Sequence, residues 1–120
     1  MPDRDPTYDP ACLFCRIAAG EIPSDRVHED DEVVVFRDVN PQAPTHLLAI
    51  SRRHVPSAND LTDADGALLA ALFGALRNVA TGAGLRGYRI VTNVGPESGQ
   101  SVFHLHFHLL GGRPMTWPPG

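Results

Sequence analysis

The stretch His104-Leu105-His106-Phe107-His108-Leu109-Leu110 governs how the whole chain is interpreted. Histidine and apolar residues alternate strictly in it, and successive side chains of a β-strand leave opposite faces of the pleat. The pattern therefore predicts a strand over residues 104–110. We expect its three imidazoles on one face and Leu105, Phe107 and Leu109 in the core on the other.

Three imidazoles on one strand face indicate a site for chemistry. The unperturbed pKa of histidine is about 6.5, so such a row is only partly charged at neutral pH. We expect mutual repulsion to lower the pKa of at least one ring, leaving a neutral nitrogen that can attack an electrophile or bind a metal. The alternative is an exposed face that is rich in histidine by chance, although three of the six histidines fall within residues 104–108.

The composition describes one ordinary soluble domain. A chain of 120 residues, 42% hydrophobic and 20% charged, suits a single core. Its net charge of −4 argues against a nucleic acid or an anionic membrane as partner, and no apolar run approaches the roughly 20 residues of a membrane span. The first six residues lack an apolar signal core, so we expect a cytoplasmic protein whose cysteines are thiols or metal ligands.

The remaining pattern predicts a flexible arm over residues 1–11 and a single domain over residues 12–120. Strands are expected over residues 26–28, 33–36, 46–50, 88–93 and 104–110, and helices over residues 12–19 and from Thr62 to Gly82. Asp65 completes a capping box with Thr62, and leucines spaced by three and four residues mark the buried stripe of the second helix. This order predicts an α+β fold with a five-stranded, mostly antiparallel sheet and helices on one face.

Residues 104–110 match the His-φ-His-φ-His-φ-φ motif, φ being apolar, of the histidine-triad nucleotide hydrolases and transferases. The chain resembles the nucleotide-binding branch of that family most, over roughly residues 12–120. The other segments that carry the likeness are Phe36-Arg37-Asp38, Pro41-Gln42-Ala43-Pro44-Thr45-His46, Gly99-Gln100-Ser101-Val102 and Trp117-Pro118-Pro119-Gly120. The resemblance implies a homodimer with joined sheets, whose C-terminal tail reaches toward the partner's active site.

The resemblance assigns catalysis to His106, His108, Ser101 and His46. It implies that His106 attacks the α-phosphorus of a nucleoside phosphoramidate, while its other ring nitrogen donates to a backbone carbonyl near His104. Water would then cleave the nucleotidyl-histidine. His108 would bond phosphate oxygens, Ser101 would assist the leaving group, and His46 would join the phosphate and leaving-group region. Without the resemblance, His46 would be interpreted as a structural loop or strand residue.

Substrate binding is assigned on the same basis. Asp38 is expected to accept hydrogen bonds from ribose hydroxyls, the alternative being a turn-capping role. Gly99 and Gln100, with Ser101, would offer backbone N–H groups to an anion. The remaining residues that the resemblance places at the base pocket, at the phosphate or in the tail are Phe14, Ile17, Phe36, Val39, Asn93 and Trp117. The apolar members would otherwise be interpreted as core.

Cys12-x-x-Cys15 in a helical turn brings two thiolates within reach of one ion. Several bacterial histidine-triad proteins carry a four-ligand zinc site, and Cys12, Cys15, His54 and His104 stand in matching positions here. The resemblance therefore implies a closed structural zinc site that does not activate water. The alternatives are a redox pair and two small buried hydrophobic residues.

The function implied by the resemblance is that of a purine nucleoside phosphoramidase, which releases a nucleoside monophosphate of the AMP type and an amine. Two other functions stay open. One is hydrolysis or phosphorolysis of dinucleoside polyphosphates, which the Gly-Gln-Ser segment and the Trp-Pro-Pro-Gly ending disfavour. The other is a nucleotide-binding interaction protein with vestigial catalysis, which the complete histidine motif disfavours.

Overall fold

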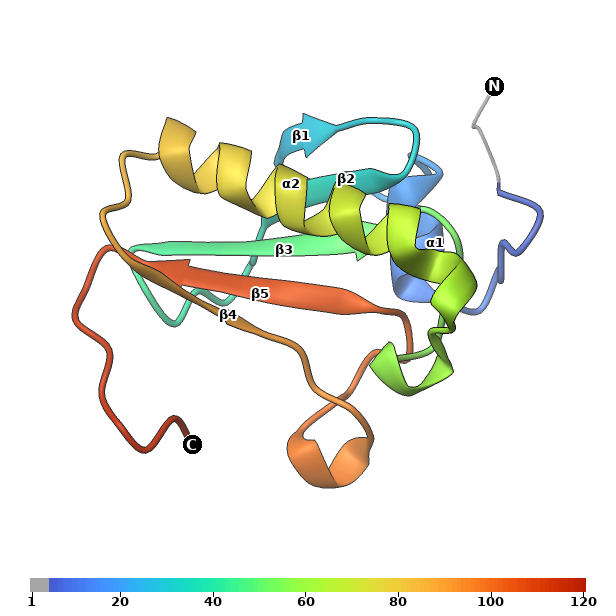
Figure 1. The fold of residues 1–120 in the computed structure, drawn as a ribbon. Coiled ribbons are helices and arrows are strands. Elements are labelled where there is room, and N and C mark those ends of the chain that lie inside the picture. Colours follow the sequence, from blue (N-terminus) through green and yellow to red (C-terminus); the bar gives the residue numbers. More distant parts are fainter. Residues whose placement is uncertain (1–4) are drawn as a thin grey trace.

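The computed structural model describes residues 5–120 as one sheet with helices on both faces (Figure 1). The strands lie in the order β1-β2-β3-β5-β4, and each neighbouring pair is antiparallel. The elements are α1 (Leu13–Ala18), β1 (Arg26–Glu29), β2 (Val33–Arg37), β3 (Thr45–Ser51), α2 (Gly66–Gly82), β4 (Tyr88–Val91) and β5 (His106–Gly111). The predicted α+β class, with five strands and two helices, is confirmed. Within the described residues, neither helix combines the length and the apolar character needed to cross a membrane.

The two helices pack on opposite faces of the sheet, so the prediction that they share one face is wrong. Helix α2 packs on the face formed by Val33, Val35, Leu47 and Ala49 together with the apolar residues of the histidine stretch. Helix α1 packs on the other face, formed by Val34, Phe36, Leu48 and Ile50. Strands β2 and β3 are thus covered on both sides along residues 33–36 and 47–50, and segments buried in this way are apolar throughout rather than alternating. Their sequence therefore could not show which face each helix covers.

The histidine strand begins two residues later than predicted. Strand β5 starts at His106, and the N–H of Leu105 donates to the Val55 carbonyl oxygen (2.6 Å). The alternation of side chains nevertheless holds across the whole stretch. Leu105, Phe107 and Leu109 are buried on the α2 side, whereas the rings of His104 and His106 both contact Phe14 of α1.

The long helix begins at the predicted capping box. The Thr62 N–H donates to the Asp65 carboxylate (2.7 Å), and the Ala64 N–H donates to the Thr62 hydroxyl (3.3 Å). Residues 63–65 form one 3-10 turn before α2 starts at Gly66. Arg53, just after β3, pairs with Asp65 and ties this helix start to the sheet.

The described part of the N-terminal arm is hydrogen-bonded to the domain. The His54 N–H donates to the Thr7 hydroxyl (2.7 Å), and the Tyr8 hydroxyl donates to Glu21 (2.6 Å). The predicted flexibility of residues 1–11 also concerns residues 1–4, which lie outside the described residues. That prediction stays a prediction.

Candidate functional site

A pocket of about 820 Å³ opens on the α1 side of the sheet. Its apolar wall comes from α1, β2 and β3 and includes Phe14, Ile17, Phe36 and Leu48. Its polar groups come from β5 and from the segments that follow β2 and β4, and include Asp38, Asn93, Ser101, His106 and His108. The fold therefore brings an apolar wall, a carboxylate, a hydroxyl and two imidazoles into one cavity. Val39 and Gly99 also border it, Val39 as a fully exposed rim residue.

His106 is held at this pocket by its own strand. Its Nδ1 lies 2.6 Å from the carbonyl oxygen of His104. Because a carbonyl oxygen only accepts, Nδ1 carries the proton and Nε2 keeps the lone pair. The ring of His106 also packs edge-on against Phe14, with centroids 5.0 Å apart. The expected backbone acceptor is thus present, and the second nitrogen is free to act as a base or nucleophile.

Burial is the main cause of the low pKa values in the triad. It lowers the pKa of His106 although the hydrogen bond to the His104 carbonyl opposes the shift. It also lowers the pKa of His104 to about 4. The pKa of His108 is lowered by burial first and by the neighbouring charges of His106 and His46 second. The predicted direction is right, but repulsion between the rings is the smaller cause.

His46 lies behind His108 and does not line the pocket. Its Nε2 is 2.9 Å from Nδ1 of His108 and 3.3 Å from Oδ2 of Asp38. Its Nδ1 accepts the backbone N–H of Gln42 (2.9 Å). The ring is buried, so contact with a substrate would fall to His108 and Asp38 rather than to His46.

The glycine-rich segment is built differently from the prediction. The N–H groups of Gly99 and Gln100 donate to the carbonyl oxygens of Pro96 and Gly95 within their own turn. The predicted use of these two amides for an anion is therefore wrong. The Gln100 side chain is buried, accepts the Gly95 N–H (2.8 Å) and donates to the Pro56 carbonyl (2.8 Å). It shapes the loop, while Ser101 faces the pocket.

Three groups that the sequence did not single out support the histidines. The Ser51 carbonyl lies 2.6 Å from Nε2 of His104, and the Thr92 hydroxyl donates to the His106 carbonyl (2.8 Å). The third is the Gln42 N–H described above. Two of the three act through the backbone, which no pattern of residue types encodes. Thr92 could have been suspected only because it directly precedes Asn93 of the pocket.

Trp117 does not border the pocket of its own chain. Its side chain is 81% exposed, and the Arg89 guanidinium lies 5.9 Å from its ring centre. The predicted approach of this tail to a partner's active site concerns a second copy. It stays a prediction.

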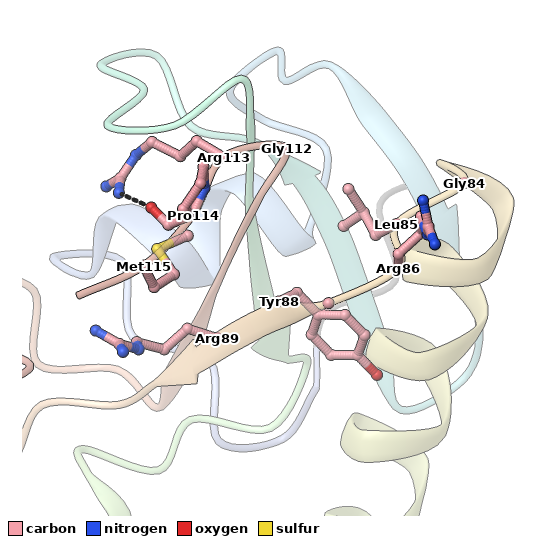
Figure 2. A pocket seen from close by; sticks show the side chains of 10 residues that line it. Gly84, Leu85, Arg86, Tyr88, Arg89, Gly112, Arg113, Pro114 and Met115 are labelled. Atoms are coloured by element: carbon pink, nitrogen blue, oxygen red, sulfur yellow. Dashed lines mark hydrogen bonds between the residues drawn. The ribbon is translucent and has the colours of Figure 1, made fainter. Parts of the chain in front are cut away.

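A second, smaller hollow of about 560 Å³ lies between the loop after α2 and the segment after β5 (Figure 2). Arg86, Arg89 and Arg113 border it together with Leu85, Tyr88 and Met115. The Arg89 guanidinium donates to the Thr116 carbonyl (2.9 Å) and that of Arg113 to the Pro114 carbonyl (3.1 Å). No predicted catalytic residue lies there, so the histidine pocket is the candidate site of chemistry.

Beside the histidine pocket, four potential metal ligands converge: the side chains of Cys12, Cys15, His54 and His104. Their ligand atoms all lie within 4.8 Å of one another. The Nδ1 atoms of His54 and His104 are 3.3 Å apart. Sulfur–nitrogen distances are 3.3 Å for Cys12–His104 and Cys15–His54 and 3.6 Å for Cys15–His104. A tetrahedral zinc ion with ordinary bond lengths needs N···N edges of about 3.3 Å and S···N edges of about 3.5 Å. The cluster therefore has the size of a zinc site.

The protonation of the cluster also suits a cation. The contact of Nε2 of His104 with the Ser51 carbonyl leaves its Nδ1 lone pair directed at the cysteines, as in metal-bound histidines. Burial raises the pKa of the Cys15 thiol to about 12, so a thiolate at this position needs a positive charge beside it. The Cys15 N–H donates to Cys12 Sγ (3.3 Å) at the start of α1. These four residues can bind a metal ion such as zinc.

Comparison with known proteins identifies the family. The family model described as "Scavenger mRNA decapping enzyme C-term binding" matches residues 11–117. An uncharacterised HIT-like protein of Synechocystis sp. is 48% identical over 109 residues, which are 90% of this chain and 96% of that protein. A solved HIT family hydrolase from Legionella pneumophila shares 53% identity with a TM-score of 0.89, covering 91% of this chain and 99% of that one. A HIT family hydrolase from Clostridium thermocellum shares 39% identity with a TM-score of 0.87, covering 90% and 96%. The chain belongs to the histidine-triad (HIT) family.

Proposed function

We propose that this protein is a hydrolase that cleaves the P–N bond of purine nucleoside phosphoramidates through a nucleotidyl-histidine. The observation that carries the proposal is the fixed ring of His106, whose Nδ1 donates to its own strand while Nε2 is free in the pocket. A neutral imidazole nitrogen aimed in this way is a nucleophile for phosphorus. Relatives named as HIT family hydrolases support the reaction class.

The proposed reaction has two displacements at phosphorus. His106 Nε2 attacks the α-phosphorus of a substrate protonated on its bridging nitrogen, the P–N bond breaks, and the neutral amine leaves while Nε2–H of His108 donates a hydrogen bond to a phosphate oxygen. Water then attacks the same phosphorus, loses a proton to solvent, and releases the nucleoside monophosphate and the neutral His106 ring. The His104 carbonyl stabilises the positive charge of the substituted His106 ring. Ser101 lines the same cavity and would hydrogen-bond the leaving amine.

The nucleoside would occupy the apolar side of the pocket. Asp38 Oδ1 accepts the Asn40 N–H (2.8 Å), which fixes the carboxylate and leaves lone pairs for ribose hydroxyls. Phe14, Ile17, Phe36 and the exposed rim residue Val39 would contact the base. Asn93, in the same cavity, would donate to the phosphate. The cavity of about 820 Å³ is large enough for a purine nucleotide.

We assign zinc to the Cys12, Cys15, His54 and His104 cluster as a structural ion. Four protein ligands close the coordination sphere, so the ion would hold α1 and the loop after β3 together and would not activate water. The four cluster residues would keep the His104 backbone in place, and with it the acceptor of His106.

We further propose a homodimer whose sheets join. Strand β4 is an edge strand, so its outward N–H and C=O groups can pair with a second chain. This arrangement would also bring Trp117 to the partner's pocket. The net charge of −4 supports a protein without a nucleic acid or membrane partner.

The test compares an adenosine phosphoramidate with a diadenosine polyphosphate as substrate. The proposal predicts faster turnover of the phosphoramidate and none by His106→Asn, which keeps the size of the side chain. Faster cleavage of the diadenosine substrate would favour a dinucleoside polyphosphate hydrolase. AMP binding without turnover of any phosphoramidate would favour a nucleotide-binding protein with vestigial catalysis.

A further inference from the structure

A continuous chain of hydrogen bonds runs from the backbone of the loop after β2 to the pocket. The Gln42 N–H lies 2.9 Å from Nδ1 of His46, and Nε2 of His46 lies 2.9 Å from Nδ1 of His108. Asp38 Oδ2 is a second neighbour of the same His46 nitrogen at 3.3 Å. The His46 ring is buried, and its neighbours come from β5 and the loop before β3.

The chemistry of these groups fixes where each proton sits. A backbone N–H can only donate, so Nδ1 of His46 must be the acceptor and its proton must be on Nε2. That Nε2–H then donates to Nδ1 of His108, because Nδ1 is the nearer of its two neighbours. A histidine that accepts at Nδ1 carries its proton on Nε2. In His108 the protonated Nε2 is on the side of the ring away from His46. His108 lines the pocket.

We infer that His46 is a positioning residue that fixes the tautomer of His108, so that His108 presents an Nε2–H donor to the pocket. The Gln42 N–H, which lies outside the cavity, fixes the tautomer of His46, and His46 in turn fixes the tautomer of His108. The tautomer of His108 is thus opposite to that of His106, whose proton is on Nδ1. One ring offers a lone pair to the bound group and the ring two residues further along offers a proton.

Asp38 connects this chain of hydrogen bonds to nucleoside binding, a step that rests on the proposed function. In the structure its Oδ2 competes with His108 for the proton on Nε2 of His46. Ribose hydroxyls donating to Oδ2 would satisfy that carboxylate oxygen and commit the His46 proton to His108. Binding of the nucleoside would therefore sharpen the tautomer of the ring that donates a hydrogen bond to the bound phosphate.

The direct test is NMR of the full chain with ¹⁵N-labelled histidine. Long-range ¹H–¹⁵N correlations report which nitrogen of His108 carries the proton, and a scalar coupling across the N–H···N bond reports its partner. We expect a His108 ring protonated on Nε2 and a coupling between its Nδ1 and Nε2 of His46. A His108 protonated on Nδ1, or a metal-bound shift at that nitrogen, would overturn the inference. Neither readout requires turnover, so failure of the proposed function would be seen separately.

Variants extend the test. His46→Phe should give His108 a mixture of both tautomers, and His46→Gln, which restores an N–H donor, should recover much of the Nε2–H form. His28→Phe is the matched control, because His28 lies on β1 beside Asp30 and away from the pocket. In turnover, His46→Phe should lower kcat about 10- to 100-fold with little change in KM. An unchanged His108 tautomer in folded His46→Phe would also overturn the inference.

Discussion

The backbone carbonyl oxygen of His104 accepts the Nδ1 proton of His106 at 2.6 Å, while the ring of His104 belongs to the Cys/His cluster. One residue therefore serves two neighbouring sites, through its backbone in one and its side chain in the other. Any change that displaces the His104 ring should also disturb the orientation of His106. The cluster and the pocket are thus coupled through His104, although none of the four cluster side chains lines the pocket.

The first prediction concerns the metal cluster. Cys12→Ser should reduce bound zinc from about one ion per chain to a small fraction, because a closed site needs its full set of ligands. It should lower the free energy of unfolding by at least about 2 kcal/mol. Elemental analysis and denaturant unfolding would measure the two effects. Wild-type protein that stays metal-free after growth in ample zinc would contradict the assignment.

The second prediction concerns nucleoside recognition. Asp38→Ala should raise KM for an adenosine phosphoramidate about 10- to 100-fold, as expected for hydrogen bonds to a charged group. A 2′,3′-dideoxy substrate should bring wild-type KM close to that of the variant and should change the variant little. Asp31→Ala, an exposed carboxylate outside the pocket, is the control. Equal sensitivity of wild type and Asp38→Ala to the missing hydroxyls would show that Asp38 does not bind ribose.

The third prediction concerns the start of α2. Thr62→Ala removes the hydroxyl that accepts the Ala64 N–H, and loss of such a cap lowers the free energy of unfolding by about 1 kcal/mol. Thr81→Ala, at an exposed position near the end of the same helix, should change it by less than about 0.5 kcal/mol. Urea unfolding of both variants measures the difference. Equal stability of the two would refute the capping role.

The fourth prediction concerns the end of β5. Gly112 has φ +89°, and an added Cβ would lie 2.9 Å from Cβ of Pro44. Gly112→Ala should therefore lower the free energy of unfolding by about 1 to 3 kcal/mol. Gly111→Ala should be milder, because its Cβ would meet the flexible end of Leu85. Gly120→Ala, in open space, is the control for the alanine itself. A larger loss for Gly111→Ala would contradict this account.

Much of this architecture could be predicted because local signals and tertiary packing agree. The box of Thr62 and Asp65 marks the start of the long helix, and the alternation around His106 assigns each side chain of the stretch to its face. The side of the sheet that α1 covers could not be predicted, because β2 is apolar at every position from Val33 to Phe36. A strand that is buried on both faces carries no periodic signal.

The candidate site could be predicted in its side chains better than in its hydrogen bonds. Asp38, Ser101 and His108 do share one cavity. His46 and Gln100, however, act behind that cavity, and their positions depend on backbone partners. Almost every residue has a backbone N–H and a backbone carbonyl, so nothing in the sequence marks the amide of Gln42 or the carbonyl of Pro56. Only the fold decides which of them meets a side chain.

The central claim is that Nε2 of His106 becomes covalently bonded to phosphorus. The most direct measurement is mass spectrometry of protein mixed rapidly with an adenosine phosphoramidate and quenched under alkaline denaturing conditions. We predict one adenylyl group on the peptide that carries His106, and none in His106→Asn. Turnover in the absence of any adduct, or an adduct on a different residue, would contradict the account.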